Sequence, residues 1–251
     1  MSKYFEINRN GQNVRCKLYA NDPDGIRTLV LFGHGFAGHK DNGAAEKFSK
    51  RLLSKHKDAA VLIFNLPAHG DDVKKKISLG DCLGYIGIVL EYIRETWSEA
   101  VLYSYATSFG GYLILRYISE YGNPFVRIAL RCPAVDMYDV LTRSIMTEEE
   151  RAAVGKGKTV PVGFDRKIDV CPAFLEELRF ADIRQSSFLP YADELLILHG
   201  TADEVVPFAS AKAFAEDNVI DFIPVEGADH RFQDPALMEI ATKAVFEFFG
   251  F

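Results

Sequence analysis

A serine lies where an apolar stretch meets a run of small residues. Residues 102–111 read LYSYATSFGG, and Ser108 falls where a predicted strand turns sharply into a helix. In such a turn the hydroxyl is held above the sheet, and the residues two before and two after must be small. Ala106 and Gly110 meet that demand. The pattern favours a nucleophile, although a serine that merely caps the helix beginning at Phe109 is a common alternative.

A carboxylate follows a second apolar stretch. The predicted strand at 194–199 leads into GTADEVVP, which puts Asp203 in the loop beyond it. A buried aspartate there can accept the N–H of a histidine, fix its tautomer and stabilise its protonated form. Asp136, which follows the preceding predicted strand, is the alternative acid.

A histidine follows the last predicted strand. Residues 225–232 read VEGADHRF, so that His230 lies between that strand and the final helix. Histidine can accept a serine proton near neutral pH and return it to a leaving group. A lone histidine in a loop is more often a solvated polar residue, so the interpretation of His230 as a general base depends on its partners.

The elements that must position these residues alternate along the chain as strand and helix. After an expected N-terminal hairpin, this rhythm indicates a parallel sheet of about eight strands with helices on both faces, an α/β fold in a single domain, 1–251. Strands are expected at 3–8, 14–20, 28–32, 60–65, 100–105, 126–131, 194–199 and 221–225, and helices at 44–56, 81–96, from 109, 208–217 and 235–249. Ser108, Asp203 and His230 each follow such a strand, and the carboxyl ends of parallel strands share one edge.

One segment, 135–191, interrupts the alternation. It carries mixed charges and shows no strand-like alternation, so we interpret it as an inserted cap. A connection this long in a compact domain is usually a lid or disordered, and its large apolar residues favour order. These residues are Phe164, Phe174, Leu175, Leu178, Phe180 and Phe188.

The three chemical motifs resemble those of the α/β-hydrolase family. Its usual nucleophile motif is Gly-x-Ser-x-Gly, and this chain departs from it mildly at Ala106. The chain order Ser, Asp, His is also the family's order. The resemblance implies a catalytic triad of Ser108, Asp203 and His230, and an oxyanion hole formed by the backbone N–H groups of Phe36 and Phe109.

The resemblance covers nearly the whole chain and is strongest to bacterial cinnamoyl and feruloyl esterase-like carboxylesterases. It rests on the motifs HGF (34–36), AHG (68–70), HGTAD (199–203) and EGADH (226–230). It implies hydrolysis of a small, aromatic or apolar ester through an acyl-enzyme, without a cofactor. A thioesterase, an acyl-peptide hydrolase, a lyase, or a ligand-binding protein that has lost turnover would use the same scaffold.

Other histidines and glycines do not indicate a metal or nucleotide site. His34, His69 and His199 each precede a glycine after a strand, with no i, i+4 pair on a helix and no nearby cysteine, so structural roles are favoured. The glycines at 33–38 mimic a dinucleotide motif, but the next strand lacks an acidic residue for the ribose.

The composition of the chain limits the classes of partner that we expect it to bind. The chain has 251 residues, a formal net charge of −6 and a sequence pI near 5.6, which disfavours nucleic acid and anionic membranes. The four cysteines are widely spaced and are expected to be free. No apolar stretch reaches membrane-spanning length, and we expect a cytoplasmic protein. The sequence leaves the oligomeric state open, a homodimer included.

Overall fold

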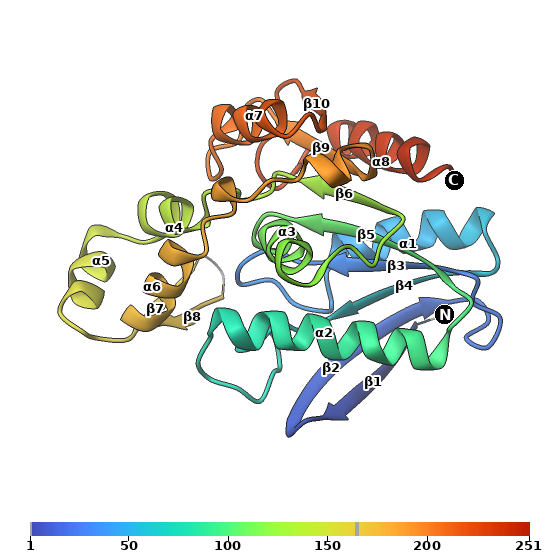
Figure 1. Cartoon of the computed structure of the whole chain (residues 1–251), viewed down its shortest axis with the longest axis horizontal. Helices are drawn as coiled ribbons and strands as arrows, with labels where there is room; N and C mark the ends of the chain where they lie inside the picture. Colours follow the sequence, from blue (N-terminus) through green and yellow to red (C-terminus); the bar gives the residue numbers. More distant parts are fainter. Residues whose placement is uncertain (1, 164–165) are drawn as a thin grey trace.

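The apolar stretches of the sequence form one large sheet. In the computed structural model, which describes residues 2–163 and 166–251, eight strands pair in the order β1-β2-β4-β3-β5-β6-β9-β10. The β1–β2 and β2–β4 pairs are antiparallel, and the remaining pairs are parallel. This sheet confirms the predicted fold class (Figure 1). The strands are β1 Ser2–Arg9, β2 Gln12–Ala20, β3 Thr28–Gly33, β4 Ala59–Phe64, β5 Val101–Thr107, β6 Arg127–Arg131, β9 Leu195–Gly200 and β10 Asp221–Val225.

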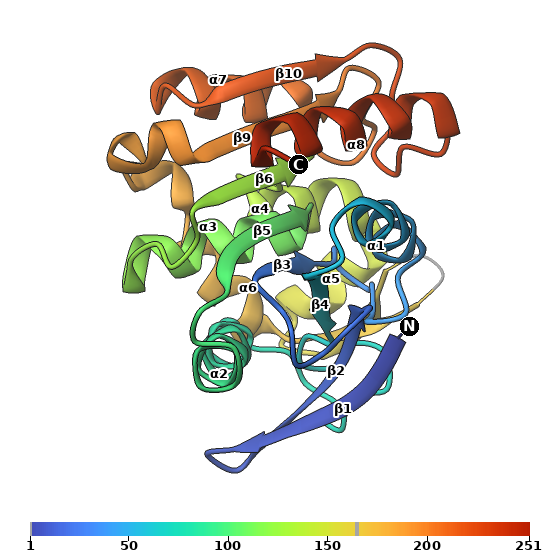
Figure 2. The ribbon, with the colours of Figure 1, turned by 90° about the vertical axis from the view of Figure 1, so that its right-hand side faces the viewer.

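Helices cover both faces of the sheet because the central strands are apolar on both sides. Leu29 and Leu31 of β3 join one hydrophobic cluster, and Val30 and Phe32 join another. The first cluster includes residues of α2, α3 and α7, and the second includes residues of α1 and α8. The turned view in Figure 2 separates these two layers. The helices are α1 Gly43–Lys55, α2 Leu79–Thr96, α3 Phe109–Tyr121, α7 Phe208–Asp217 and α8 Pro235–Phe249.

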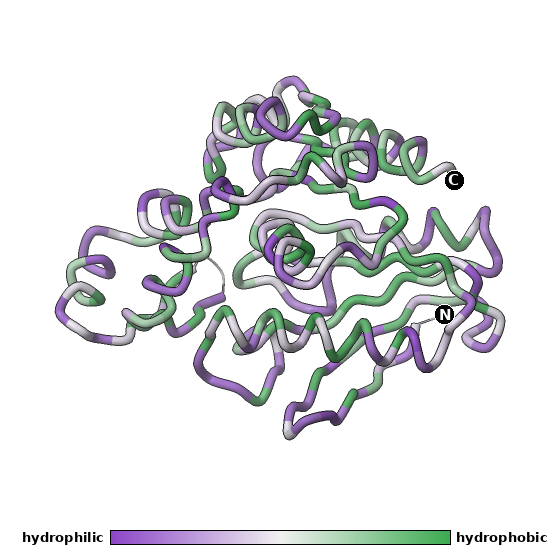
Figure 3. The backbone as a smooth tube through the Cα atoms, in the orientation of Figure 1, coloured by the Kyte–Doolittle hydropathy of each residue, from purple (hydrophilic) through white to green (hydrophobic). Residues whose placement is uncertain are grey.

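The N-terminal hairpin closes through a two-residue turn. Asn10 and Gly11 both have positive φ, 51° and 72°, and such turns match the right-handed twist of the strands they join. Hydrophilic residues gather at this turn, whereas hydrophobic residues run along the central strands (Figure 3). The hairpin extends the sheet on the side away from β10.

The segment between β6 and β9 forms a separate group of short elements beyond the carboxyl ends of the strands (Figure 1). Against the expectation from sequence, it contains a small antiparallel sheet, β7–β8. Each strand has only three residues, too few for an alternating pattern to be recognised. The group comprises α4 Met137–Asp139, the π-helix Val140–Ile145, α5 Glu148–Gly155, β7 Val160–Val162, β8 Ile168–Val170, α6 Pro172–Phe180 and two 3₁₀ helices, Ile183–Gln185 and Leu189–Glu194.

The large apolar residues of this segment take different positions. Phe174, Leu178 and Phe188 are buried in the main hydrophobic cluster, Leu175 packs against it, and Phe180 is 82% exposed. Phe164 lies outside the described residues. Burial of the first three residues attaches the segment to the helix layer formed by α2, α3 and α7.

Two sequence expectations about the whole chain can be compared with the structure. The four cysteines are free, and three of them, Cys16, Cys82 and Cys132, are buried. Among the helices in residues 2–163 and 166–251, none is both long and apolar enough to cross a membrane.

Candidate active site

Ser108 occupies a strained turn between β5 and α3. Its φ of 52° and ψ of −120° lie in a region that non-glycine residues rarely adopt, at a typical cost of about 1–3 kcal/mol. Hydrogen bonds hold the turn, because the Ser108 N–H donates to the Arg131 carbonyl oxygen at 3.0 Å. The Ser108 side chain makes no capping bond to α3. The helix-cap interpretation of this serine is therefore wrong.

The turn fits because glycine stands at two points of close approach. A Cβ added to Gly110 would lie 2.6 Å from the His34 carbonyl oxygen. At the other small position, Ala106 is paired in register with Gly33 of β3. A Cβ added to Gly33 would lie 2.9 Å from the Ala106 Cβ. The methyl group of Ala106 thus occupies space that Gly33 leaves open.

The structure brings Ser108, His230 and Asp203 together in one hydrogen-bonded chain. His230 Nε2 lies 3.1 Å from Ser108 Oγ, and His230 Nδ1 lies 2.8 Å from Asp203 Oδ2. The Asp203 side chain is fully buried, the His230 side chain is 15% exposed, and Ser108 is 9% exposed. The hydroxyl can therefore transfer its proton to an imidazole that is held from the other side.

Asp203 is held in its charged form. Burial opposes ionisation, but hydrogen bonds from His199 and His230 outweigh it and lower the pKa of Asp203 far below its usual value. The other carboxylate oxygen accepts the backbone N–H groups of Val205 and Val206, at 2.9 and 2.8 Å. A carboxylate with so many donors remains an anion over the ordinary pH range and can stabilise an imidazolium.

Backbone contacts fasten the loop of Asp203 to the loop of His230. The Ala202 N–H donates to the Ala228 carbonyl oxygen at 3.1 Å. The Gly227 N–H donates to Thr201 Oγ1 at 2.9 Å. A Cβ on Gly200 would clash with the Ala228 carbonyl oxygen. Glycine at that position therefore allows the two loops to approach.

The alternative acid, Asp136, has a different partner. Its Oδ2 accepts a hydrogen bond from Ser210 Oγ at 2.9 Å, and its Oδ1 is buried without a partner among the described residues. Its contacts are therefore with α7, and Asp203 is the carboxylate that contacts His230.

The two backbone amides predicted for an oxyanion hole come from elements that meet beside the serine. Phe109 is the first residue of α3, whose positive dipole end favours a nearby anion. Phe36 follows Gly35, where an added Cβ would lie 3.3 Å from the Ser108 Cβ. The rings of Phe36 and Phe109 pack edge to face, with centroids 5.8 Å apart. Neither N–H has a hydrogen-bond partner within the described part of the chain.

The other histidines of the sequence motifs make structural hydrogen bonds. His34 Nδ1 lies 2.9 Å from the Gly35 carbonyl oxygen, and its Nε2 accepts the Leu66 N–H at 3.3 Å. His69 Nδ1 lies 2.8 Å from the Pro67 carbonyl oxygen. Burial lowers the pKa of His34 to about 4 and that of His69 to about 3. Both rings are therefore neutral near pH 7.

Sequence reasoning missed the part that His199 takes in the site. Its Nε2 lies 3.2 Å from Asp203 Oδ2 and 3.1 Å from the Val206 carbonyl oxygen, so the carboxylate has a second imidazole neighbour. Its place at the end of β9, four residues before Asp203, was the available signal.

Sequence reasoning also missed Cys132. It is the third member of a group with Asp203 and His230 whose potential metal ligands lie within 4.8 Å of one another.

A metal ion does not follow from that group. Burial raises the pKa of the Cys132 thiol well above its usual value, whereas metals bind the thiolate. Asp203 and His230 are already joined by their own hydrogen bond. The contacts of the two residues are therefore explained without an ion.

A cavity of about 430 Å³ opens beside Ser108, within the usual size range of small-molecule sites. Among the described residues, its walls come from the loop after β3, the start of α1, the ends of β5 and β6, the loops of Asp203 and His230, and the segment between β6 and β9. That segment contributes Ile145 and Arg166. Its buried aromatic residues Phe174 and Phe188 lie in the core instead. The segment therefore contributes no aromatic side chain to the described part of the cavity wall, where Phe36 is the one phenylalanine.

Comparisons with known proteins agree with this fold. The chain resembles Est1E from Butyrivibrio proteoclasticus with ferulic acid bound (TM-score 0.76, 19% identity, covering 98% of this chain and 97% of that chain). It is also similar to a putative hydrolase from Agrobacterium vitis S4 (0.76, 17%, 99% and 98%) and to mouse alpha/beta hydrolase domain-containing protein 10 (0.70, 17%, 99% and 98%). No curated protein matches the sequence significantly.

These distant structures establish the fold alone. A match to a family model also identifies the family. The model described as the prolyl oligopeptidase family matches residues 94–250, more than half of the chain. The match includes the elbow at Ser108 and the loops of Asp203 and His230. The chain is a serine hydrolase with the α/β-hydrolase fold and belongs to the prolyl oligopeptidase family.

Proposed function

We propose that the protein hydrolyses carboxylic esters through an acyl-enzyme, with Ser108 as nucleophile, His230 as general base and acid, and Asp203 as the orienting carboxylate. The observation that carries this proposal is the chain of hydrogen bonds of 3.1 and 2.8 Å through His230. It ends at a hydroxyl that faces a cavity of small-molecule size.

In the first step Ser108 Oγ attacks the ester carbonyl carbon, and His230 Nε2 takes the hydroxyl proton. The carbonyl oxygen becomes an oxyanion, which the free N–H groups of Phe36 and Phe109 are placed to receive. Collapse of this intermediate breaks the bond to the alcohol oxygen, and the imidazolium returns its proton to the departing alcohol. Asp203 stabilises the transient positive charge on the ring.

In the second step water replaces the alcohol. His230 Nε2 removes a proton from the water, whose oxygen attacks the acyl carbon, and the bond to Ser108 Oγ then breaks. The proton returns to the serine, and a carboxylic acid leaves. The reaction needs no group beyond water and the residues named.

For the substrate we propose a small ester with an aromatic or apolar acyl group, of the cinnamoyl or feruloyl kind. The presence of ferulic acid in the structure of Est1E, which shares the fold, supports this choice, as does the Phe36 ring in the cavity wall. We also propose that the segment 135–191 acts as the cap of the site, because Ile145 and Arg166 reach the cavity.

Peptide hydrolysis is the second candidate, and the family match favours it specifically. The same triad can form an acyl-enzyme from an amide, provided that the leaving amine is protonated. A panel of p-nitrophenyl esters, acyl thioesters and short chromogenic peptides separates the candidates through their kcat/KM values. We expect the esters to give the highest values, and a higher value for a peptide would overturn the proposal.

Replacement of the nucleophile tests the mechanism. Ser108→Ala should lower kcat by roughly 10⁶-fold, because the imidazole loses the group it activates. It should also abolish labelling by a fluorophosphonate probe. Ser119→Ala, on the exposed face of the same helix, is the matched control and should retain both activities. Folded wild-type protein that neither turns over an ester nor takes up the probe would instead indicate a ligand-binding protein.

A further inference from the structure

A buried arginine in the cavity wall has no acidic partner. Arg131, the last residue of β6, is 7% exposed and lines the cavity beside Ser108. Its guanidinium lies 5.1 Å from the centre of the Phe232 ring. One nitrogen contacts Met238 Sδ at 3.1 Å, and Nε has no partner among the described residues. No carboxylate of those residues forms an ion pair with Arg131.

A buried positive charge is costly unless an anion or hydrogen-bond acceptors lie beside it. A guanidinium remains protonated in proteins, and burial of an unpaired cation is strongly unfavourable. An aromatic face, a thioether and the neutral hydroxyl of the buried Tyr105, which also interacts with the Arg131 side chain, offset only part of that cost. The backbone of Arg131 is enclosed between β5 and β9, so its side chain is the part that reaches the cavity. The cavity is therefore where a counter-charge can reach the guanidinium.

Arg131 is also close to the reacting group. Its carbonyl oxygen accepts the Ser108 N–H at 3.0 Å, and it is paired in register with Thr107, the residue before the nucleophile. A molecule bound in this cavity at Ser108 is therefore within reach of the Arg131 side chain.

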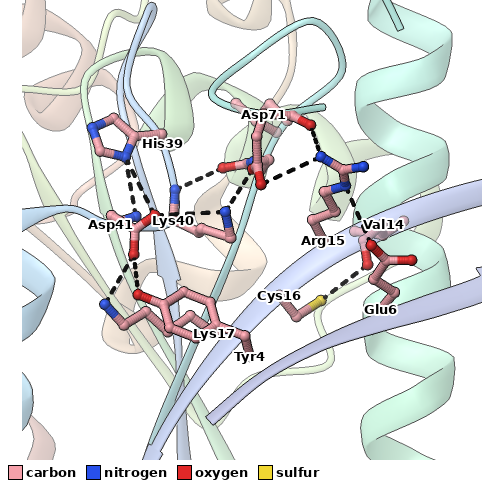
Figure 4. Close-up of polar contacts among 12 residues, drawn as sticks. Tyr4, Glu6, Val14, Arg15, Cys16, Lys17, His39, Lys40, Asp41 and Asp71 are labelled. Atoms are coloured by element: carbon pink, nitrogen blue, oxygen red, sulfur yellow. Dashed lines mark hydrogen bonds and ion pairs between the residues drawn. The ribbon is translucent and has the colours of Figure 1, made fainter. Parts of the chain in front are cut away.

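The other charges around the cavity do not neutralise Arg131. Among the described lining residues, Asp41 is the one carboxylate. Figure 4 shows it surrounded by Tyr4, Lys17 and Lys40. Its Oδ1 accepts hydrogen bonds from the Tyr4 hydroxyl at 2.6 Å and from Lys17 Nζ at 3.0 Å, and Lys40 Nζ lies 3.5 Å from its Oδ2. This aspartate is already paired.

A second arginine adds positive charge to the cavity wall. Arg166 lines the cavity and has no ion pair with any residue in 2–163 or 166–251. Burial and the positive charge of Arg166 lower the pKa of His39, another wall residue. The start of α1, at Asn42 and Gly43, presents the positive end of its dipole to the same space.

We propose that this cavity binds an anionic group of the substrate, a carboxylate or a phosphate, through Arg131. The inference rests on the proposed function, because the anion is taken to be part of the ester that Ser108 attacks. It narrows the substrate class to esters with a negative charge on the acyl or the alcohol part. Arg166 reinforces the field at the cavity wall.

Pairs of esters that differ in one charge test the proposal. Mono-p-nitrophenyl glutarate against p-nitrophenyl valerate places the charge on the acyl part. 4-Acetoxybenzoate against its methyl ester places it on the alcohol part, and 4-acetoxyphenyl phosphate replaces the carboxylate by a phosphate. We expect at least one charged ester to exceed its neutral partner in kcat/KM by about tenfold or more, as a charged hydrogen bond provides. The preference should fall as NaCl is added.

Variants at the two ends of β6 test whether Arg131 causes the preference for charged esters. Arg131→Gln should remove most of the charged-to-neutral ratio, and Arg131→Lys should restore part of it. Arg127→Gln is the matched control, because Arg127 also packs over a phenylalanine, Phe248, but at the opposite end of the strand. It should keep the wild-type ratio. An unchanged ratio in Arg131→Gln, or no charge preference in the wild type, overturns the proposal.

Binding measurements separate this proposal from the proposed function and do not depend on a folded Arg131 variant. Glutarate or inorganic phosphate should raise the Tm of the wild type and of Ser108→Ala in a concentration-dependent way. Hydrolysis of neutral esters alone, with no such rise, would preserve the esterase and refute the anion site. A rise in Tm without hydrolysis of any ester would preserve the site and refute the esterase.

Discussion

Strand β6 carries an arginine at each end, and the two have different environments. Arg127, at the amino end, donates to the Phe248 carbonyl oxygen and packs over the Phe248 ring. Arg131, at the carboxyl end, packs over Phe232 in the same way, but its Nε has no partner among the described residues. An arginine of the same strand is thus satisfied by a backbone carbonyl at one end, whereas at the other end it is buried in the wall of a cavity without an acidic partner.

Backbone strain is also concentrated at the carboxyl edge of the sheet, where Arg131 lies. Seven described non-glycine residues have positive φ, and five of them follow the carboxyl ends of β3, β4, β5 and β6 or lie in the loop of His230. These five are Ala37, Ala68, Ser108, Cys132 and Phe232. Each such conformation costs free energy that the surrounding packing must offset. Strained backbone and unpartnered buried polar atoms therefore occur together at the carboxyl edge of the sheet. Departures of this kind are expected at functional sites, where polar groups must stay available for a substrate.

After loss of the nucleophile itself, the largest expected effect at this edge comes from its buried acid. Asp203→Asn should lower kcat by roughly 10⁴-fold, because an amide at this position favours the wrong tautomer of His230. Asp136→Asn, which changes the carboxylate bonded to Ser210, should leave kcat near the wild-type value. Steady-state kinetics with one p-nitrophenyl ester measures both. The reverse order of effects would make Asp136 the orienting acid and refute the assignment.

The next effect concerns pH and the two buried histidines of the same edge. The pKa values of His34 and His69 are lowered by burial to about 4 and about 3, from 6.5 in the unfolded chain. Between those values the unfolded chain binds more protons, so the free energy of unfolding must fall as pH falls through that window. Each histidine should contribute a loss of roughly 2–3 kcal/mol on going from pH 7 to 4.5. Asp203, whose pKa is lowered from 3.8, acts only below that range.

Denaturant unfolding at several pH values, on the wild type and on His69→Asn, tests this expectation. Asparagine can still donate to the Pro67 carbonyl oxygen that His69 contacts but does not titrate. The variant should be less stable at pH 7 and should show a shallower decline toward pH 4.5. If its decline matches that of the wild type, His69 does not contribute to the acid sensitivity of the fold.

The sheet could be predicted from sequence because its information is local and repeated. Apolar runs such as 28–32 and 194–199 mark strands buried on both faces, and the predicted bounds of α7 and α8 agree with the structure. The convergence of Ser108, Asp203 and His230 also followed, because strand order places their loops at one edge. Their catalytic roles remain a prediction that kinetics must test.

The segment between β6 and β9 and the contents of the cavity could not be predicted in the same way. Strands of three residues, such as Val160–Val162, carry no readable period. Phe174 and Phe188 are aromatic, but only the tertiary structure decides that they face the core rather than the cavity. The absence of an acidic partner for Arg131 is likewise a property of packing, which leaves no mark in the neighbouring residues.

The smallest expected effect tests how tightly the edge is packed around the elbow. Gly33→Ala should destabilise the protein by about 1–3 kcal/mol, because the new Cβ would meet Ala106 Cβ at 2.9 Å. The double variant Gly33→Ala with Ala106→Gly should recover most of that loss, since the two methyl groups compete for one space. Gly84→Ala is the control in α2, where an added Cβ meets nothing within 4 Å. It should stabilise the helix by about 0.5–1 kcal/mol. Equal destabilisation of the single and double variants, measured by thermal unfolding, would show that Gly33 is required for a reason other than Ala106.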